Sequence, residues 1–101
     1  MAQIKNAYIV YIDFDGDIKS KYSWGKWFVF TELKEVKSII VEALTDLMHH
    51  QEERDRSATI EVGEYSIPIA DVLESDTLLE EYIDSGGSDM GNWEISIHKT
   101  F

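Results

Sequence analysis

Cysteine is absent from the 101-residue sequence, which therefore has no disulfide, no thiolate metal ligand and no cysteine nucleophile. This absence argues against a small secreted scaffold, because such proteins commonly depend on disulfides. Long apolar runs are also absent, since no stretch approaches the roughly 18 apolar residues that span a bilayer. The N-terminus has no basic segment leading into an apolar run, as a signal peptide would. We therefore expect a cytoplasmic protein, in the host cell cytoplasm if the chain is phage-encoded.

Positive charge is scarce, above all in the second half of the chain. The 9 Lys and Arg residues face 20 Asp and Glu, which gives a net charge of −11. Residues 1–41 carry a net charge of +1, residues 42–56 carry −3 and residues 57–101 carry −9. Between Arg56 and Lys99 there is no Lys or Arg. This distribution repels nucleic acid and anionic membranes, and it attracts a basic protein through long-range steering.

The composition is that of a folded domain. Hydrophobic residues make up 44% of the chain, aromatic residues 12% and charged residues 29%, so there is enough apolar surface to form a core. A chain of this length has room for one such core. We therefore expect residues 1–101 to form a single globular domain.

The first 30 residues predict an antiparallel meander of three strands. Residues 4–14 alternate in hydropathy, and Ile9 and Tyr11 make the second face apolar as well, so this strand is expected near the centre of the sheet. Asp15-Gly16 is typical of a hairpin turn. Residues 18–23 and 26–30 then predict the second and third strands.

The remainder predicts two helices, a hairpin and a last strand. Apolar residues from Leu33 to Met48 recur at helical spacing, and a polar run ends this long helix before residue 57. Residues 58–69 predict a hairpin turning at Gly63-Glu64. Residues 71–84 predict a second helix, residues 88–92 a loop, and the chain from Trp93 a final strand. The expected fold is α+β, in the order βββαββαβ, with an antiparallel sheet packed against one long helix and a second short acidic helix.

The second predicted helix separates its apolar residues from its acids. Asp76, Glu80 and Asp84 follow one another at i,i+4 spacing, where like charges cost about 0.2–0.5 kcal/mol per pair. No lysine lies nearby in sequence to relieve this repulsion. Because these acids lie opposite the apolar arc of the helix, reversing their charges is expected to leave the fold intact and even to stabilise it. An acidic face kept only for solubility would more commonly mix both signs.

These acids and their neighbours are the predicted partner-binding residues. Trp24 and Trp27 flank Gly25 and are predicted to add aromatic contacts. The acidic residues predicted to contact the partner are Asp76, Glu80, Asp84, Glu74, Glu81, Glu64, Glu61 and Asp89. Binding through them should weaken strongly as salt rises.

A strict copy of duplex DNA is less well supported than a general acidic surface. Four helical residues rise about 6 Å, whereas one duplex strand carries a charge about every 3.4 Å. One stripe is therefore too sparse, and mimicry would need a second row of acids such as Glu74 and Glu81.

Two motifs are candidates for a catalytic or metal site. The run from Ile9 to Asp17 resembles the opening motif of haloacid-dehalogenase phosphatases, an apolar strand ending in Asp-x-Asp-Gly. That family has Thr where this chain has Asp17, and a helix rather than an alternating strand follows the motif. Asp46, His49, His50 and Glu53 recur at helical spacing and could hold a divalent metal, although a solvated helix end explains them more simply. We expect no enzyme activity, no metal and no cofactor.

The leading hypothesis is a small acidic, non-catalytic inhibitor. It would occupy the basic nucleic-acid-binding surface of a partner, a nucleic-acid-binding enzyme or effector complex, as phage anti-CRISPR and anti-restriction proteins do. The alternatives are a toxin immunity protein and a structural or adaptor subunit whose acidic surface only aids solubility. No direct contact with nucleic acid or membrane is expected, and the sequence leaves the oligomeric state open.

Overall fold

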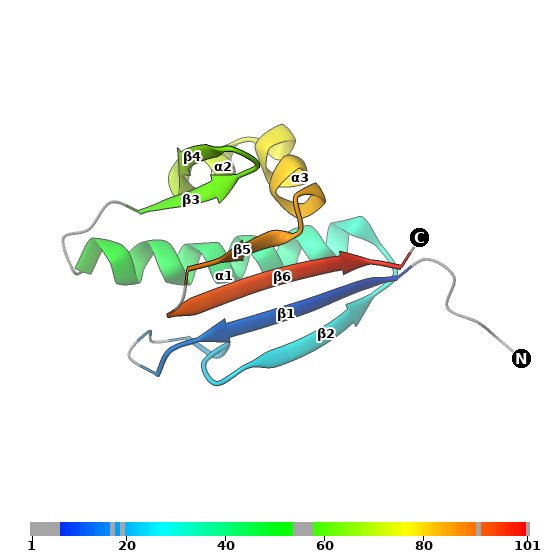
Figure 1. Ribbon diagram of the computed structural model, residues 1–101, viewed down its shortest axis with the longest axis horizontal. Coiled ribbons are helices and arrows are strands. Elements are labelled where there is room, and N and C mark those ends of the chain that lie inside the picture. Colours follow the sequence, from blue (N-terminus) through cyan, green and yellow to red (C-terminus); the bar gives the residue numbers. More distant parts are fainter. Residues whose placement is uncertain (1–6, 17, 19, 54–57, 91, 101) are drawn as a thin grey trace, which may run out of the picture.

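Four strands form the main sheet of the computed structural model, which describes residues 7–16, 18, 20–53, 58–90 and 92–100. All neighbouring strands are antiparallel. Their order across the sheet is β2 (Lys26–Phe30), β1 (Tyr8–Phe14), β6 (Trp93–Lys99) and β5 (Gly87–Asp89). The helix α1 (Leu33–Glu53) runs along one face of this sheet, and no described element covers the other face (Figure 1).

A second group of elements packs on α1 and beside β5. A two-stranded sheet lies next to two short helices, which contact α1, while β3 contacts β5 (Figure 1). These elements are β3 (Thr59–Val62), β4 (Tyr65–Pro68), α2 (Ile69–Glu74) and α3 (Asp76–Asp84). Because α1 contacts both this group and the sheet, it joins the two parts of the fold.

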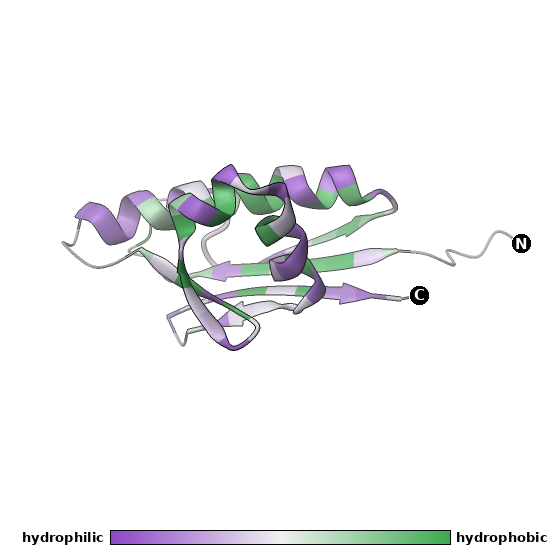
Figure 2. Cartoon of the chain, turned by 90° about the horizontal axis from the view of Figure 1, so that it is seen from above, coloured by the Kyte–Doolittle hydropathy of each residue, from purple (hydrophilic) through white to green (hydrophobic). Residues whose placement is uncertain are grey.

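The core follows from the two periodicities of the sequence. In β1, alternate residues from Tyr8 to Phe14 are buried toward α1, while Ile9 and Tyr11 lie on the open face. Along α1, hydrophobic and hydrophilic bands alternate (Figure 2). The buried residues of α1 recur every three to four positions: Val36, Ile39, Ile40, Ala43, Leu44, Leu47 and His50.

Several expectations are confirmed. The class is α+β, with an antiparallel sheet and one long helix. The strand β1 lies between β2 and β6, which places it centrally as its two apolar faces indicate. The β3–β4 hairpin pairs Val62 with Tyr65, so the turn at Gly63-Glu64 has the expected register. The predicted strand residues 4–6 and the helix residues 54–56 lie outside the described residues.

The expected second strand is wrong. Residues 20–23 form turns and one isolated parallel bridge between Phe14 and Ser23, and the strand beside β1 is β2. Ile18 and Tyr22 are both buried, so their spacing reflects two anchors of a packed loop. The Ser23 hydroxyl donates to the carbonyl of Ile18 at 2.9 Å, which is the kind of local bond that competes with strand pairing.

The expected second helix is interrupted. Helix α2 begins at Ile69 rather than at Asp71, and Ser75 is extended, with φ −122° and ψ 112°. The Ser75 hydroxyl accepts the Leu78 amide at 3.2 Å and caps α3, so a new helix starts there. The expected loop at residues 88–92 is also wrong in part, because Gly87–Asp89 pairs with β6 as β5. The observed order is ββαββααββ.

None of the helices in the described residues combines the length and the apolar character that a bilayer-spanning helix needs.

The β5–β6 pairing depends on a glycine, which gives a first prediction. A Cβ on Gly87 would lie 1.9 Å from the Ile95 carbonyl oxygen, and its φ of +93° is itself unfavourable for other residues. Gly87→Ala should lower the free energy of unfolding by about 3 kcal/mol or more, because strain and a backbone clash add together. Urea unfolding measures this change.

The control is Gly63→Ala at the hairpin turn. Gly63 also has a positive φ, +62°, but an added Cβ meets nothing within 4 Å. It should therefore cost only about 1–2 kcal/mol. Equal losses in the two variants would contradict the close packing of β5 on β6.

Candidate partner-binding surface

The elements from β3 to α3, residues 59–84, form what we call the acidic lobe. It contains eight carboxylates and no Lys, Arg or His. Seven of the eight residues are exposed and Glu80 is half-buried. The carboxylates are Glu61, Glu64, Asp71, Glu74, Asp76, Glu80, Glu81 and Asp84. The lobe is therefore a concentrated negative surface on one side of α1.

Two lysines from outside the lobe bind three of its acids. The Lys37 Nζ, on α1, donates to both carboxylate oxygens of Asp76, at 2.9 and 3.1 Å, and to Glu80 Oε1 at 2.6 Å. The Lys99 Nζ, on β6, forms an ion pair with Asp84. These hydrogen bonds raise the pKa of Lys37 and of Lys99. The gain in stability expected on reversing this stripe assumed unrelieved repulsion, which these ion pairs contradict.

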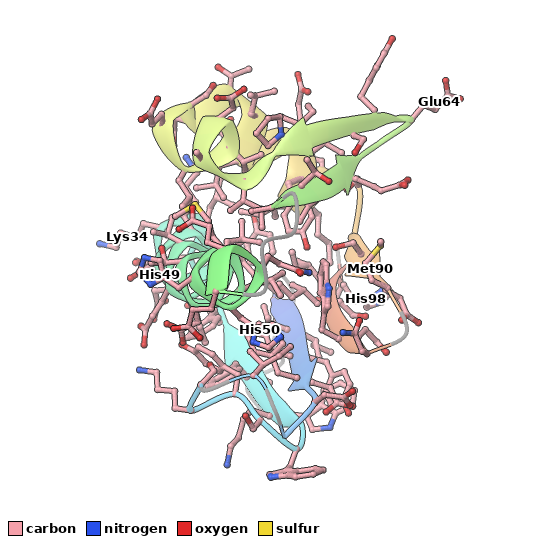
Figure 3. The ribbon with its side chains drawn as sticks, turned by 90° about the vertical axis from the view of Figure 1, so that its left-hand side faces the viewer. Lys34, His49, His50, Glu64, Met90 and His98 are labelled. Carbon is pink, nitrogen blue, oxygen red and sulfur yellow. The ribbon has the colours of Figure 1, made fainter. Side chains whose placement is uncertain are left out.

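The other predicted acids lie in separate places. Glu74, at the end of α2, lines a groove against α1 beside Lys34 and Lys37. Glu81 is exposed on α3. Glu64 points outward from the tip of the β3–β4 hairpin (Figure 3). The sequence therefore predicts which residues are acidic and exposed, but not how they are grouped.

Glu61 and Asp89 meet at a groove between β3 and β5. The groove has a volume of about 370 Å³. Its lining is mostly polar or backbone: Glu61, Gly63, Ser85, Gly87, Ser88, Asp89 and Met90. Its polar wall is fixed in place, because the Tyr82 and Ser88 hydroxyls are 2.7 Å apart and hydrogen-bonded. Burial raises the pKa of Tyr82, so this phenol stays protonated.

This groove has the chemistry to receive a basic side chain. Two carboxylates offer acceptors for the planar N–H groups of an arginine or for a lysine ammonium. The serine hydroxyls at its wall supply further acceptors. Sequence reasoning named Glu61 and Asp89 individually, but only the contact between β3 and β5, which belong to different sheets, brings them together.

Trp24 and Trp27 lie away from the acidic lobe. Their exposed fractions are 81% and 70%. Trp27 packs against Tyr11 on the open face of the sheet, with ring centroids 4.5 Å apart. Trp24 has a φ of 69° and lies in the loop before β2. The two predicted kinds of contact residue, aromatic and acidic, thus belong to different surfaces.

The histidine-containing cluster does not form a set of converging ligands. Asp46, His49, His50 and Glu53 line a small groove of about 170 Å³. His50 is buried, whereas His49 projects from another side of α1 (Figure 3). The Asp46 carboxylate accepts the Ser20 hydroxyl at 2.8 Å. Within the described residues, no group of three or more potential ligands is placed to hold a metal ion.

The residues that resemble the phosphatase motif lie in a different setting. Asp13, at the end of β1, is paired across the sheet with Glu94 of β6. Asp15 is exposed, and its carbonyl accepts the Ile18 amide at 2.9 Å in a turn. A loop leads from this turn to the antiparallel strand β2, so the strand-to-helix arrangement of that family is not formed.

Comparison with known proteins identifies no relative. No protein-family model matches the sequence, and searches of curated proteins and solved structures give no match. The function is therefore inferred from the surfaces described above.

The Lys37 bridge gives a second prediction. Lys37→Met keeps the aliphatic stem but removes the ammonium, so Asp76 and Glu80 repel each other and the melting temperature should fall by several degrees. The control is Lys34→Met, because Lys34 is exposed and, among the described residues, pairs only with Glu32, at 3.3 Å. Calorimetry at pH 7 compares the two variants with the wild type.

The same bridge sets a pH dependence. Because the pKa of Lys37 is raised above its ordinary 10.5 in the folded state, its contribution is complete below that value. It is lost as the pH rises through the raised pKa, so the difference between wild type and Lys37→Met should shrink there. A Lys37→Met variant as stable as Lys34→Met at pH 7 would contradict the bridge.

Proposed function

We propose that this chain is a non-catalytic binding protein whose acidic lobe occupies the basic, nucleic-acid-binding surface of a partner protein. The observation that carries the proposal is the concentration of eight carboxylates in residues 59–84, without a cationic side chain among them. A surface of one sign steers an oppositely charged protein toward it and repels nucleic acid. A chain bound to that surface prevents the partner from binding nucleic acid, so binding alone is enough to inhibit it.

Most of this attraction comes from the acids of the lobe that Lys37 and Lys99 do not bind. Lys37 and Lys99 neutralise part of the charge of Asp76, Glu80 and Asp84. By contrast, four exposed glutamates of the lobe form no ion pair with any residue that the structure describes: Glu61, Glu64, Glu74 and Glu81. The groove at Glu61 and Asp89 adds a defined position for one arginine or lysine of the partner.

This arrangement favours a general basic-surface binder over a copy of duplex DNA. Asp76, Glu80 and Asp84 form a regularly spaced stripe. These are also the acids that Lys37 and Lys99 bind. The remaining acids are spread over the β3–β4 hairpin, α2, α3 and the groove at Glu61 and Asp89. Membership of a phage counter-defence class, or of the toxin immunity proteins, stays a prediction of this proposal.

A structural or adaptor role is the second candidate function. It is favoured by the open face of the sheet, where Trp27 and Val29 are 70% and 59% exposed. Apolar and aromatic side chains in such positions are common at protein interfaces. An adaptor would bind through this face, and the acidic lobe would then serve solubility.

Binding through the lobe gives a third prediction. The tagged chain is used to capture its partner from extracts of its native host, and affinity is then measured at several salt concentrations. The double variant Glu61→Lys/Asp89→Lys should weaken binding roughly 100-fold at low salt, because attraction is replaced by repulsion. Duplex DNA or RNA should compete with the wild-type chain for the same partner.

The matched control is Glu52→Lys/Glu53→Lys, which makes the same change in charge at the exposed end of α1. It should weaken binding less than about threefold, since only the long-range term changes. Affinity that is insensitive to salt, or a partner that binds nucleic acid and this chain at once, would disprove the proposed function.

The absence of catalysis gives a fourth prediction. The purified chain should hydrolyse phosphate esters no faster than buffer in the presence of Mg²⁺, because Asp13 lies within β1 and Asp15 in a turn that leads to an antiparallel strand and not to the family's helix. Asp13→Asn and Asp15→Asn should leave that background unchanged. Metal-dependent turnover that either substitution abolishes would show that the chain is an enzyme.

A further inference from the structure

The strand β2 is an open edge of the main sheet. It pairs with β1 on one side, and no segment of the described chain pairs with its other side. Alternate backbone N–H and C=O groups of an edge strand are therefore available to another strand. Figure 1 shows β2 at the edge of the molecule opposite the acidic lobe.

This edge is apolar on both faces. Trp27 and Val29 are 70% and 59% exposed on the open face of the sheet. On the other face, the Phe28 and Phe30 rings stack with centroids 6.0 Å apart and line a groove of about 710 Å³ against α1. Proteins commonly protect such edges with charges, proline or bulges, whereas β2 has only Lys26 at its start.

The charges around the groove are mixed and close to balanced. Three lysines and two glutamates lie there: Lys21, Lys26, Lys34, Glu35 and Glu42. Lys21 pairs with Glu42, and Lys34 pairs with Glu32. Lys26 and Glu35 have no ion pair with any described residue; Lys26 begins β2, and Glu35 lies in the first turn of α1, which follows the other end of β2. Since the whole chain has a net charge of −11, this edge is where a second copy meets the least repulsion.

We propose that a second copy of this chain docks here, its β2 antiparallel to the first, so that the two sheets become one. A two-fold axis at Phe28 places Phe28 opposite itself and Trp27 opposite Val29 of the second copy. This register allows backbone hydrogen bonds whether the outward N–H and C=O groups belong to residues 26, 28 and 30 or to residues 27 and 29. The axis also brings Lys26 of one copy to the start of α1 in the other, where Glu35 lies. The surface is thus complementary to itself, as a two-fold interface requires.

The dimer would leave both acidic lobes free at its outer ends. Each lobe lies across the molecule from β2, so a partner bound there is not displaced by dimerisation (Figure 1). The two interactions also respond to salt with opposite sign. Screening strengthens the association of two like-charged copies, whereas it weakens the binding of a basic partner.

A charge exchange tests the proposal by sedimentation equilibrium. Lys26→Glu and Glu35→Lys should each raise the dimer dissociation constant roughly tenfold, and the double variant should restore it. The wild-type dimer should tighten as salt rises. The matched control is Lys34→Glu, which has the same change in charge as Lys26→Glu but is not restored by Glu35→Lys.

The register is tested with single cysteines, for which the chain offers a cysteine-free background. Opposite residues in an antiparallel pair lie about 4.5–5.5 Å apart, within the Cα separation that a disulfide tolerates. A mixture of Trp27→Cys and Val29→Cys chains should therefore cross-link much faster than either chain alone. Trp27→Cys mixed with Tyr65→Cys is the control, because Tyr65 is 73% exposed on the acidic lobe.

Three results would overturn the proposal. They are a wild-type chain that stays monomeric up to about 1 mM, a double variant that fails to restore dimerisation, and cross-linking as fast in the Tyr65→Cys mixture as in the Trp27/Val29 mixture. None of them bears on whether the acidic lobe binds a basic partner. Failure of the dimer and failure of the proposed function are therefore distinguishable.

Discussion

The Lys37 ammonium, held between Asp76 and Glu80, is the interaction on which the arrangement of charge in this protein depends. The chain places most of its lysines in its first 41 residues, whereas residues 57–101 carry half of its acids and a single lysine. A lobe made only of the second part would repel itself. Folding brings Lys37 of α1 and Lys99 of β6 against it, and each stabilises acids that the sequence leaves without a counter-charge.

The helix α1 is the element that makes this possible. Its apolar residues pack on the sheet, while Lys37 faces the lobe and Val41 lines the groove beside it. The lobe adds its own buried residues, among them Val72, Leu79 and Tyr82, so apolar burial and ion pairs fix it together. The acids without lysine partners then project from a rigid support, which lowers the entropy cost of binding through them.

The sequence predicts those parts of the fold that depend on residues close together in the chain. The alternation in β1, the helical spacing in α1 and the turn at Gly63-Glu64 each specify a structure without help from distant residues. The sequence predicts a strand around Ile18 and Tyr22, where the structure has a loop. Two buried side chains at an even spacing give the same pattern as a strand with one buried face. The break between α2 and α3 has a sequence signal, because Ser75 is a typical N-cap residue three positions before Leu78. The apolar spacing continues across Ser75, however, and so predicts one helix.

The candidate site was predicted as a set of residues but not as a surface. The acids could be named because charge and exposure follow from sequence. The bridges could not, since Lys37 is 39 residues from Asp76 and 43 from Glu80. For the same reason the groove at Glu61 and Asp89 appears only once β3 lies beside β5. Neither the Lys37 bridges nor the contact between β3 and β5 can be recognised from the spacing of residues along the chain.

The two proposed interaction surfaces lie at opposite sides of the molecule and differ in their physics (Figure 1). The proposed attraction of the acidic lobe for its partner is one of charge, whereas the proposed contact at the β2 edge consists of backbone hydrogen bonds and apolar side chains. The most direct test of the central claim is amide hydrogen exchange of the chain, free and bound to its captured partner. The account predicts new protection in residues 59–90, with β2 no more protected than in the free chain. Protection confined to the open sheet face around Trp27 and to the loop at Trp24, with residues 59–90 unchanged, would contradict it.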